Sequence, residues 1–298
     1  MKKQNLKKFL VIFFITMCVT GLYFSEHYVT DAYKIVNIGF EEYSKVKVGE
    51  GRLILYCMCK IINFIIHGKI DMTTYLVIYR VLLLITNIIL SASILIVYNK
   101  IIEVGSVESK KVKILVFISI LTSFYCLSIT ECLLFIENVA MITSLLLATI
   151  AAIKYSKRRY ILSILILIVG VFCYQGTINF FVAFAFFLVT TINENKKIQL
   201  KDALKIGGIY LITLVINFIF IKIIGTENRI IVEPVKILKN ISSIVIFSVF
   251  YIILYVIIIS VLGIIFKLKR EEYLNLNLLA ILSTISCTAL LFGSSSRI

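Results

Sequence analysis

Long uncharged stretches recur along almost the whole sequence, and they constrain the fold more than any other feature. A stretch of about 20 mostly apolar residues is long enough to cross a bilayer as a helix. We find such stretches at residues 9–25, 72–98, 114–130, 136–153, 160–173, 177–192, 203–224, 241–266 and 274–292. Only 16% of the residues are charged, whereas soluble domains have about 25%. The sequence therefore predicts an all-α, multi-pass membrane protein with about nine transmembrane helices, in a single domain that covers residues 1–298.

The positions of the basic residues indicate which loops face the cytoplasm. A further apolar run, 53–66, has Lys60 near its centre and is short for a span. If it does not cross, the N-terminus lies inside, and the inside loops hold 19 of the 31 Lys and Arg residues but only 6 of the 16 acidic residues. If it crossed, every later loop would change sides, which the positive-inside rule disfavours. We therefore expect 53–66 to lie on the outer leaflet.

The excess of basic residues also bears on the partners of the protein. The formal net charge is +15, which in a soluble protein would point to nucleic acid. Here +13 of it lies in the inside loops, where it orients the chain in the membrane, and the outer segments are neutral overall. The sequence thus indicates the lipid bilayer, and not nucleic acid, as a partner.

The first outer loop, residues 25–71, contains the longest hydrophilic stretch on the outer face. Helical spacing places several apolar or aromatic side chains on one face of it, namely Tyr33, Val36, Phe40 and Tyr43. Thr30-Asp31 is a good helix start, because both side chains can accept hydrogen bonds from free N–H groups. We therefore predict an amphipathic helix at the membrane surface, followed by Gly49-Glu50-Gly51-Arg52 and the second surface helix, 53–66. Such a pair of surface helices suits a protein that takes a lipid-linked substrate from the outer leaflet.

Acidic and polar side chains at the outer ends of the apolar runs are candidates for a binding site. Glu137 opens one run and Glu131 precedes it. A carboxylate at that depth is costly and by default indicates function, although an ion pair with an outer Arg is the alternative. Between two later runs, Gln175, Thr177 and Asn179 can hydrogen-bond either to sugar hydroxyls or to neighbouring helices.

Two arginines near the outer face are the basic candidates, Arg52 and Arg80. A planar guanidinium can bind two phosphate oxygens at once. From the residues alone, a phosphate role and an internal ion pair are equally open for both. The seven Cys have no zinc-like spacing, and His27 and His67 stand apart from each other. No metal site and no cofactor is predicted.

Three ordered blocks, all on the predicted outer face, together resemble one family. The blocks are Thr30-Asp31-Ala32-Tyr33 with Gly39-Phe40-Glu41-Glu42-Tyr43 and Glu50-Gly51-Arg52, then Leu134-Phe135-Ile136-Glu137, then Tyr174-Gln175-Gly176-Thr177. They resemble bacterial membrane glucosyltransferases of the O-antigen-modifying, serotype-conversion type, which have the GT-C fold. The resemblance implies a multi-pass enzyme of the bacterial plasma membrane. It would move a hexose, glucose in that family, from a polyprenyl-phosphate donor to a lipid-linked or cell-surface glycan, with a flippase and a donor synthase as functional partners.

The resemblance also implies roles for individual residues. Asp31 matches the catalytic carboxylate of the first outer loop and would take the proton of the acceptor hydroxyl. The phosphate leaving group needs a nearby cation, for which Arg52 is the first candidate and Arg80 the second. Glu137 would bind the acceptor or complete the acidic cluster. The remaining substrate-binding candidates are Glu131, Tyr174, Gln175 and Arg229.

The chain departs from the family pattern in two respects. Asp31 stands alone where many members carry an acidic pair, which leaves the identity of the base and the need for a metal open. Family members also usually continue well past this length, so we expect a further C-terminal part.

Two other functions compete with the transferase. An oligosaccharide repeat-unit polymerase would use the same kind of donor, but it is expected to carry an Arg-rich late outer loop, and 225–240 holds only Arg229. A non-enzymatic lipid or sugar transporter is expected to place charges or helix breaks near mid-membrane. Here the charges within spans lie toward the outer end, which favours the transferase.

Overall fold

The computed structural model describes residues 3–25, 30–66, 70–125, 127–192 and 196–224, together with Gly68 and a few isolated positions between 249 and 261. Every element in these continuous segments is a helix. In chain order they are α1 (Lys3–Thr20), η1 (Gly21–Phe24), α2 (Thr30–Gly49), α3 (Leu53–Ile66), α4 (Met72–Val104), α5 (Lys110–Phe124), α6 (Leu127–Leu133), α7 (Asn138–Ser156), α8 (Tyr160–Cys173), η2 (Gly176–Asn179), α9 (Phe180–Ile192) and α10 (Lys196–Ile224). The predicted spans 241–266 and 274–292, and the residues His27, His67 and Arg229, lie outside these segments.

Several of the helices have the length and apolar composition of membrane spans. In the described residues these are Gln4–Phe24, Met72–Val104, Asn138–Ser156 and Ile198–Ile224. Shorter apolar helices cover Leu53–Ile66, Tyr160–Cys173 and Gly176–Ile192. The described part of the chain is therefore that of a helical membrane protein, with four helices long enough to cross a bilayer.

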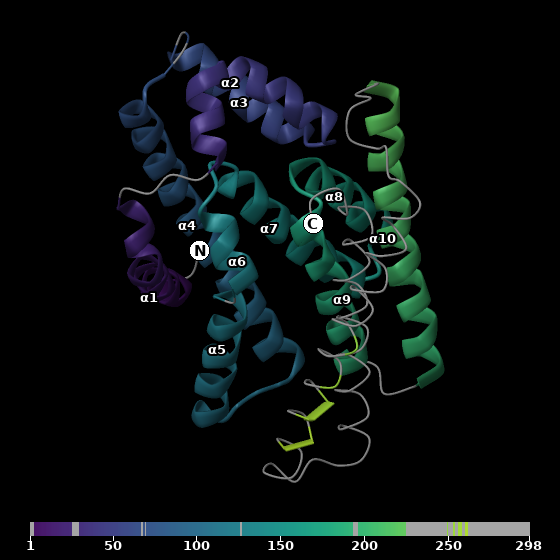
Figure 1. Cartoon of the computed structure of the whole chain (residues 1–298). Coiled ribbons are helices and arrows are strands. Elements are labelled where there is room, and N and C mark those ends of the chain that lie inside the picture. Colours follow the sequence, from purple (N-terminus) through teal and green to yellow (C-terminus); the bar gives the residue numbers. More distant parts are fainter. Residues whose placement is uncertain are drawn as a thin grey trace.

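Helix α7 lies at the centre of the bundle and packs against α4, α8 and α9 (Figure 1). Ala148, Ala151 and Ala152 of α7 are fully buried, and such small side chains let helices approach closely in a membrane. At the other end of α7, the Thr86 hydroxyl of α4 donates a hydrogen bond of 2.9 Å to Asn138 Oδ1. These contacts fix the first turn of α7, where Glu137 stands.

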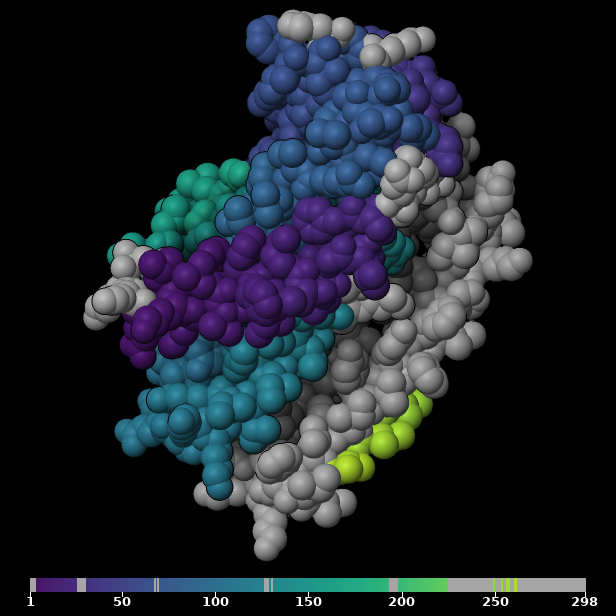
Figure 2. Space-filling view, turned by 90° about the vertical axis from the view of Figure 1, so that its left-hand side faces the viewer, coloured from purple at the N-terminus to yellow at the C-terminus, as the bar shows by residue number. Residues whose placement is uncertain are grey.

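Helix α1 runs across one face of the molecule beside α4 and α5 (Figure 2). Polar side chains join it to these helices. The Thr16 hydroxyl lies 3.1 Å from that of Ser91 and 2.5 Å from that of Tyr125, and the Asn87 amide donates to the Thr20 hydroxyl at 2.8 Å. Hydrogen bonds between helices are effective in lipid because no water competes for the same groups. They make α1 a part of the bundle.

The predicted span 114–130 is divided in the structure. α5 ends at Phe124, and α6 begins as a separate short helix at Leu127. Tyr125 leaves helical geometry, with φ −104° and ψ 25°, and its hydroxyl is held by Thr16 of α1. The break matters for function, because α6 brings Glu131 to the cavity described below.

The segment predicted to be the first outer loop folds into two helices, α2 and α3, which pack on each other across one end of the bundle (Figure 1). Helix α2 starts at Thr30, as predicted. At Gly39 the backbone adopts φ 79° and ψ 164°, which divides α2 into two parts. The interruption changes the helical register, so Phe40 and Tyr43 are buried whereas Tyr33 is 54% exposed. The prediction that Tyr33 shares their face is therefore wrong.

Helix α3 presents one buried and one exposed apolar face. Cys59 and Ile62 are buried, while Ile61, Phe64 and Ile65 are 61%, 75% and 70% exposed. A row of exposed apolar side chains on a helix that lies across the end of a bundle fits a helix resting in a lipid leaflet.

Candidate functional site

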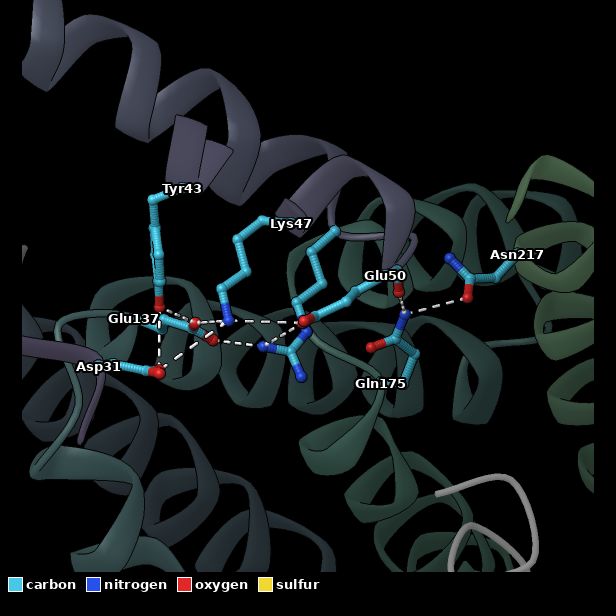
Figure 3. A network of polar contacts seen from close by, with 8 residues as sticks. Asp31, Tyr43, Lys47, Glu50, Glu137, Gln175 and Asn217 are labelled. Carbon is cyan, nitrogen blue, oxygen red and sulfur yellow. Dashed lines mark hydrogen bonds and ion pairs between the residues drawn. The ribbon is translucent and has the colours of Figure 1, made fainter. Parts of the chain in front are cut away.

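Charged side chains from separate helices meet beneath the second half of α2 (Figure 3). Asp31, Tyr43 and Lys47 come from α2, and Glu50 and Arg52 from the turn that follows it. Glu137 precedes the first residue of α7. We call these six residues the charged cluster.

Glu137 lies at the centre of the charged cluster, with a side chain only 2% exposed. Its Oε1 accepts a hydrogen bond of 2.6 Å from the Tyr43 hydroxyl and an ion pair from Lys47. Its Oε2 is paired with Arg52. Burial by itself raises the pKa of Glu137, but the charges of Arg52 and Lys47 and the hydrogen bonds from Lys47 and Tyr43 outweigh burial and lower it. Glu137 is therefore an ionised carboxylate with both oxygens in use.

Asp31 stands in the first turn of α2 and is the more accessible carboxylate of the pair. Its side chain is 28% exposed, and Lys47 Nζ is 4.0 Å from Oδ2. The Tyr43 hydroxyl lies 3.0 Å from the same oxygen. Asp31 thus has fewer close partners than Glu137 and faces the cavity described below.

Arg52 is held by carboxylates on one side and an aromatic ring on the other. Its Nη1 lies 3.2 Å from Glu50 Oε2 and is also paired with Glu137. The guanidinium carbon is 4.7 Å from the centre of the Tyr174 ring, the distance of a cation–π contact. Its Nε is buried and has no hydrogen-bond partner among the described residues.

The turn that carries Arg52 is fixed by side chains distant in the sequence. The Asn217 amide of α10 donates to the Gly51 carbonyl at 2.9 Å. The Gln175 amide donates to the Glu50 carbonyl at 2.9 Å and to Asn217 Oδ1 at 3.0 Å (Figure 3). Gly51 has a φ of +77°, and a Cβ there would lie 2.8 Å from Asn217 and Ile221. Any other residue would be strained at this φ and would displace the Asn217 and Ile221 side chains of α10.

Four residues of the charged cluster line a cavity of about 630 Å³. Its polar lining includes Asp31, Lys47, Arg52 and Glu137, joined by Glu131 and Tyr174. The rest of the lining combines the apolar side chains Ile129, Phe135, Met141, Leu145, Phe180 and Ala183 with the polar side chains Ser123, Thr177 and Asn179. The cavity can therefore accept a molecule that has both charged or polar groups and apolar surface.

Most of the site residues predicted from the sequence come together here. Seven of them line the cavity: Asp31, Arg52, Glu131, Glu137, Tyr174, Thr177 and Asn179. Gln175 supports the Arg52 turn instead. Arg80 is not among the lining residues, and its Nε donates to the Phe24 carbonyl at 2.9 Å. Arg229 lies outside the described residues.

Sequence reasoning missed three contributors, Lys47, Glu50 and Asn217. Lys47 follows Tyr43 by four residues and so shares its face of α2, a signal that could have identified it. Glu50 was seen only as part of a turn. Asn217 lies within an apolar run and gives no sign of its partner, because the hydrogen bond to Gly51 spans 166 residues.

Among the described residues, no group of three or more His, Cys, Asp and Glu side chains is arranged to hold a metal ion. The carboxylates of the charged cluster face Lys47 and Arg52 instead. Comparison with protein-family models, with curated proteins and with solved structures finds no match for this chain.

Proposed function

We propose that the protein is a membrane glycosyltransferase of the GT-C type, which moves a hexose, glucose by the resemblance stated above, from a polyprenyl-phosphate carrier to a glycan on the outer side of the plasma membrane. The observation that carries the proposal is the lining of the cavity, which combines carboxylates with Arg52 and Lys47 and also includes apolar side chains such as Ile129, Leu145 and Phe180. A lipid-phosphate sugar likewise combines a charged head with an apolar chain.

Asp31 is the base of the proposed reaction. The acceptor hydroxyl oxygen forms a bond to the anomeric carbon, and the bond from that carbon to the phosphate oxygen breaks, with its electron pair going to the phosphate. The hydroxyl proton passes to Asp31. Asp31 suits this step better than Glu137, because both oxygens of Glu137 already accept from Tyr43, Lys47 and Arg52.

Arg52 and Lys47 stabilise the charge that develops on the leaving phosphate. Positive groups held in place before the reaction act without a cost of reorganisation, and they are strongest where water is excluded. Glu137 and Glu50 keep the two cations in position. In this assignment Glu137 organises the cations and does not touch the acceptor.

The test compares variants in membranes supplied with labelled polyprenyl-phosphate hexose and surface glycan. Asp31→Asn is expected to lower transfer by about a hundredfold or more, in the range of general-base catalysis. Glu42→Gln is the matched control, because Glu42 is an exposed carboxylate on the same helix that pairs with Lys45 and is absent from the cavity lining. Full transfer by Asp31→Asn would remove Asp31 as the base. Uptake of the donor into vesicles that lack any acceptor would favour a transporter.

A further inference from the structure

The Tyr43 hydroxyl lies between the two carboxylates of the charged cluster. It is 2.6 Å from Glu137 Oε1 and 3.0 Å from Asp31 Oδ2 (Figure 3). The Tyr43 side chain is fully buried. The Tyr43 hydroxyl is thus within hydrogen-bond distance of both carboxylates. We call Asp31, Tyr43 and Glu137 the row.

The number of protons in the row limits how many hydrogen bonds its three residues can form with one another. A phenol carries one hydrogen, and an ionised carboxylate can only accept. Burial, with the nearby charges of Glu137 and Asp31, raises the pKa of Tyr43 well above its ordinary value of 10.0, so the phenol keeps its proton. Tyr43 can therefore donate to one carboxylate only. The other contact is attractive when that carboxyl carries a proton and donates it to the phenol oxygen.

The surroundings decide which carboxylate accepts from Tyr43. Glu137 has the shorter contact and is paired with two cations, Arg52 and Lys47, so it is the ionised partner. Asp31 is more exposed, and its closest cation is Lys47 at 4.0 Å. The phenol proton therefore points to Glu137, and the phenol oxygen faces Asp31.

We propose that Tyr43 is a positioning residue whose hydroxyl, fixed by Glu137, presents its oxygen to Asp31 and so holds the proton that Asp31 takes up. The inference rests on the proposed function in one respect, that this proton comes from the acceptor hydroxyl. When Asp31 accepts it, the new O–H of Asp31 donates to Tyr43, and Tyr43 continues to donate to Glu137. No proton leaves Tyr43, and Asp31 later returns its proton to water on its exposed side.

The other titratable groups near the row come from several elements. On α2 and its turn these are Lys47, Glu50 and Arg52. Glu131 of α6 and Tyr174, which follows α8, line the same cavity as Asp31 and Glu137. Cys59 of α3 interacts electrostatically with Glu137 and Lys47. Tyr75 of α4 interacts in the same way with Asp31 and Glu137. A variant at Tyr43 leaves all of these groups in place, so that a change in proton uptake reports on the phenol itself.

The experiment follows the infrared band of protonated carboxyl groups as a function of pH, with the full chain in liposomes. The band of Asp31 is identified as the part that disappears in Asp31→Asn. In Tyr43→Phe the band of protonated Asp31 is expected to appear at a pH lower than in the wild type by about one unit, since protonated Asp31 loses one hydrogen bond. Tyr56→Phe, the same loss of a hydroxyl on the surface helix α3, is expected to leave it unchanged.

Two outcomes would overturn the proposal. An unchanged band in Tyr43→Phe would mean that Tyr43 does not hold the proton, and a band formed at higher pH would mean that the phenol donates to Asp31. The acid limb of sugar transfer is measured in parallel and should move in the same direction as the band. If wild-type membranes transfer no sugar, the proposed function fails, while the infrared result still decides the role of Tyr43.

Discussion

Asp31 and Glu137 are both carboxylic acids about the same hydroxyl, yet their surroundings give them different chemistry. Glu137 is buried and accepts from three side chains, whereas Asp31 is partly exposed and is 4.0 Å from its nearest cation. A carboxylate saturated with donors is a poor base, because every hydrogen bond stabilises its ionised form. We therefore propose a structural role for Glu137, which holds the two cations in place, and a role in proton transfer for Asp31.

Replacing Glu137 tests whether its side chain stabilises the folded protein. Glu137→Gln takes from Lys47 and Arg52 one of the two carboxylates that both of them contact, and removal of one member of a buried ion pair costs about 3–5 kcal/mol. The loss would be measured by unfolding in detergent. Glu103→Gln is the control, because Glu103 pairs with Lys100 but its side chain is 68% exposed, and such pairs contribute about 0–1 kcal/mol. Equal losses in both variants would contradict the assignment.

The pH dependence of the same comparison has a definite sign. The pKa of Glu137 is lowered in the folded protein from its ordinary value of 4.5. The ionised Glu137 therefore stabilises the fold fully above pH 4.5, and this stabilisation is lost as the pH falls from 4.5 toward the lowered pKa. The difference in stability between wild type and Glu137→Gln should therefore narrow only below pH 4.5.

The two arginines predicted from the sequence can be separated by conservative substitution. Arg52→Lys keeps the positive charge but loses the planar guanidinium that lies over the Tyr174 ring and the fixed fork of N–H donors that this group provides. We expect sugar transfer to fall by about tenfold to a hundredfold. Arg80→Lys serves as the control, since Arg80 donates to the Phe24 carbonyl and is not part of the cavity lining. A larger loss in Arg80→Lys than in Arg52→Lys would reverse the assignment.

At the scale of elements, the Glu50–Arg52 turn is the part of the site with the least freedom. Asn217 and Gln175 hold its carbonyl groups, and α10 leaves no room for a side chain at Gly51. The position of the Arg52 guanidinium therefore depends on α10.

A methyl group at position 51 tests this dependence. Gly51→Ala places a carbon 2.8 Å from Asn217 and Ile221 at a positive φ. We expect a loss of about 1–3 kcal/mol in stability and a fall in transfer, because the turn must shift. Gly207→Ala within α10 is the matched control, because no atom of the described residues outside the helix backbone lies within 4 Å of its new carbon. Alanine in a helix is more stable than glycine by roughly 0.5–1 kcal/mol. Transfer at the wild-type rate by Gly51→Ala would show that the turn tolerates displacement.

The sequence predicts some elements well and others poorly, for physical reasons. Apolar runs identify helices because burial in lipid depends on composition, and Asp31, Arg52 and Glu137 stand out because charges are rare beside such runs. The face of α2 was misjudged at Tyr33 because Gly39 interrupts the helix. The break after Phe124 and the carbonyl partner of Arg80 depend on contacts with α1 and η1, which periodicity does not reveal.

At the scale of the whole molecule, the charged cluster and the basic loops lie at opposite ends of the helices. α7 begins beside Glu137 and ends at Ser156, next to Lys157, Arg158 and Arg159. By the positive-inside rule we expect the latter end to face the cytoplasm. The cluster would then face outward, where the proposed reaction uses its lipid-linked donor.

Cysteine labelling with an impermeant maleimide tests this orientation in intact cells. Lys45→Cys, on the exposed side of α2, should react from outside, and Lys157→Cys should react only after the membrane is opened. If both react from outside, then α3 crosses the membrane and the predicted arrangement is wrong. Protein without the added cysteine gives the background from the native thiols.

The support of the Arg52 turn by α10 has a consequence for biosynthesis. The ribosome releases Gly51 long before Asn217, and the hydrogen bond between them closes over 166 residues. Until α10 has been inserted, α2 and α3 can fold against each other, but the turn after α2 lacks the amide that holds Gly51. A partly synthesised chain therefore carries all the acidic side chains of the cluster without a fixed guanidinium beside them. The contacts that hold the Arg52 turn are therefore complete only after α10 has been inserted into the membrane.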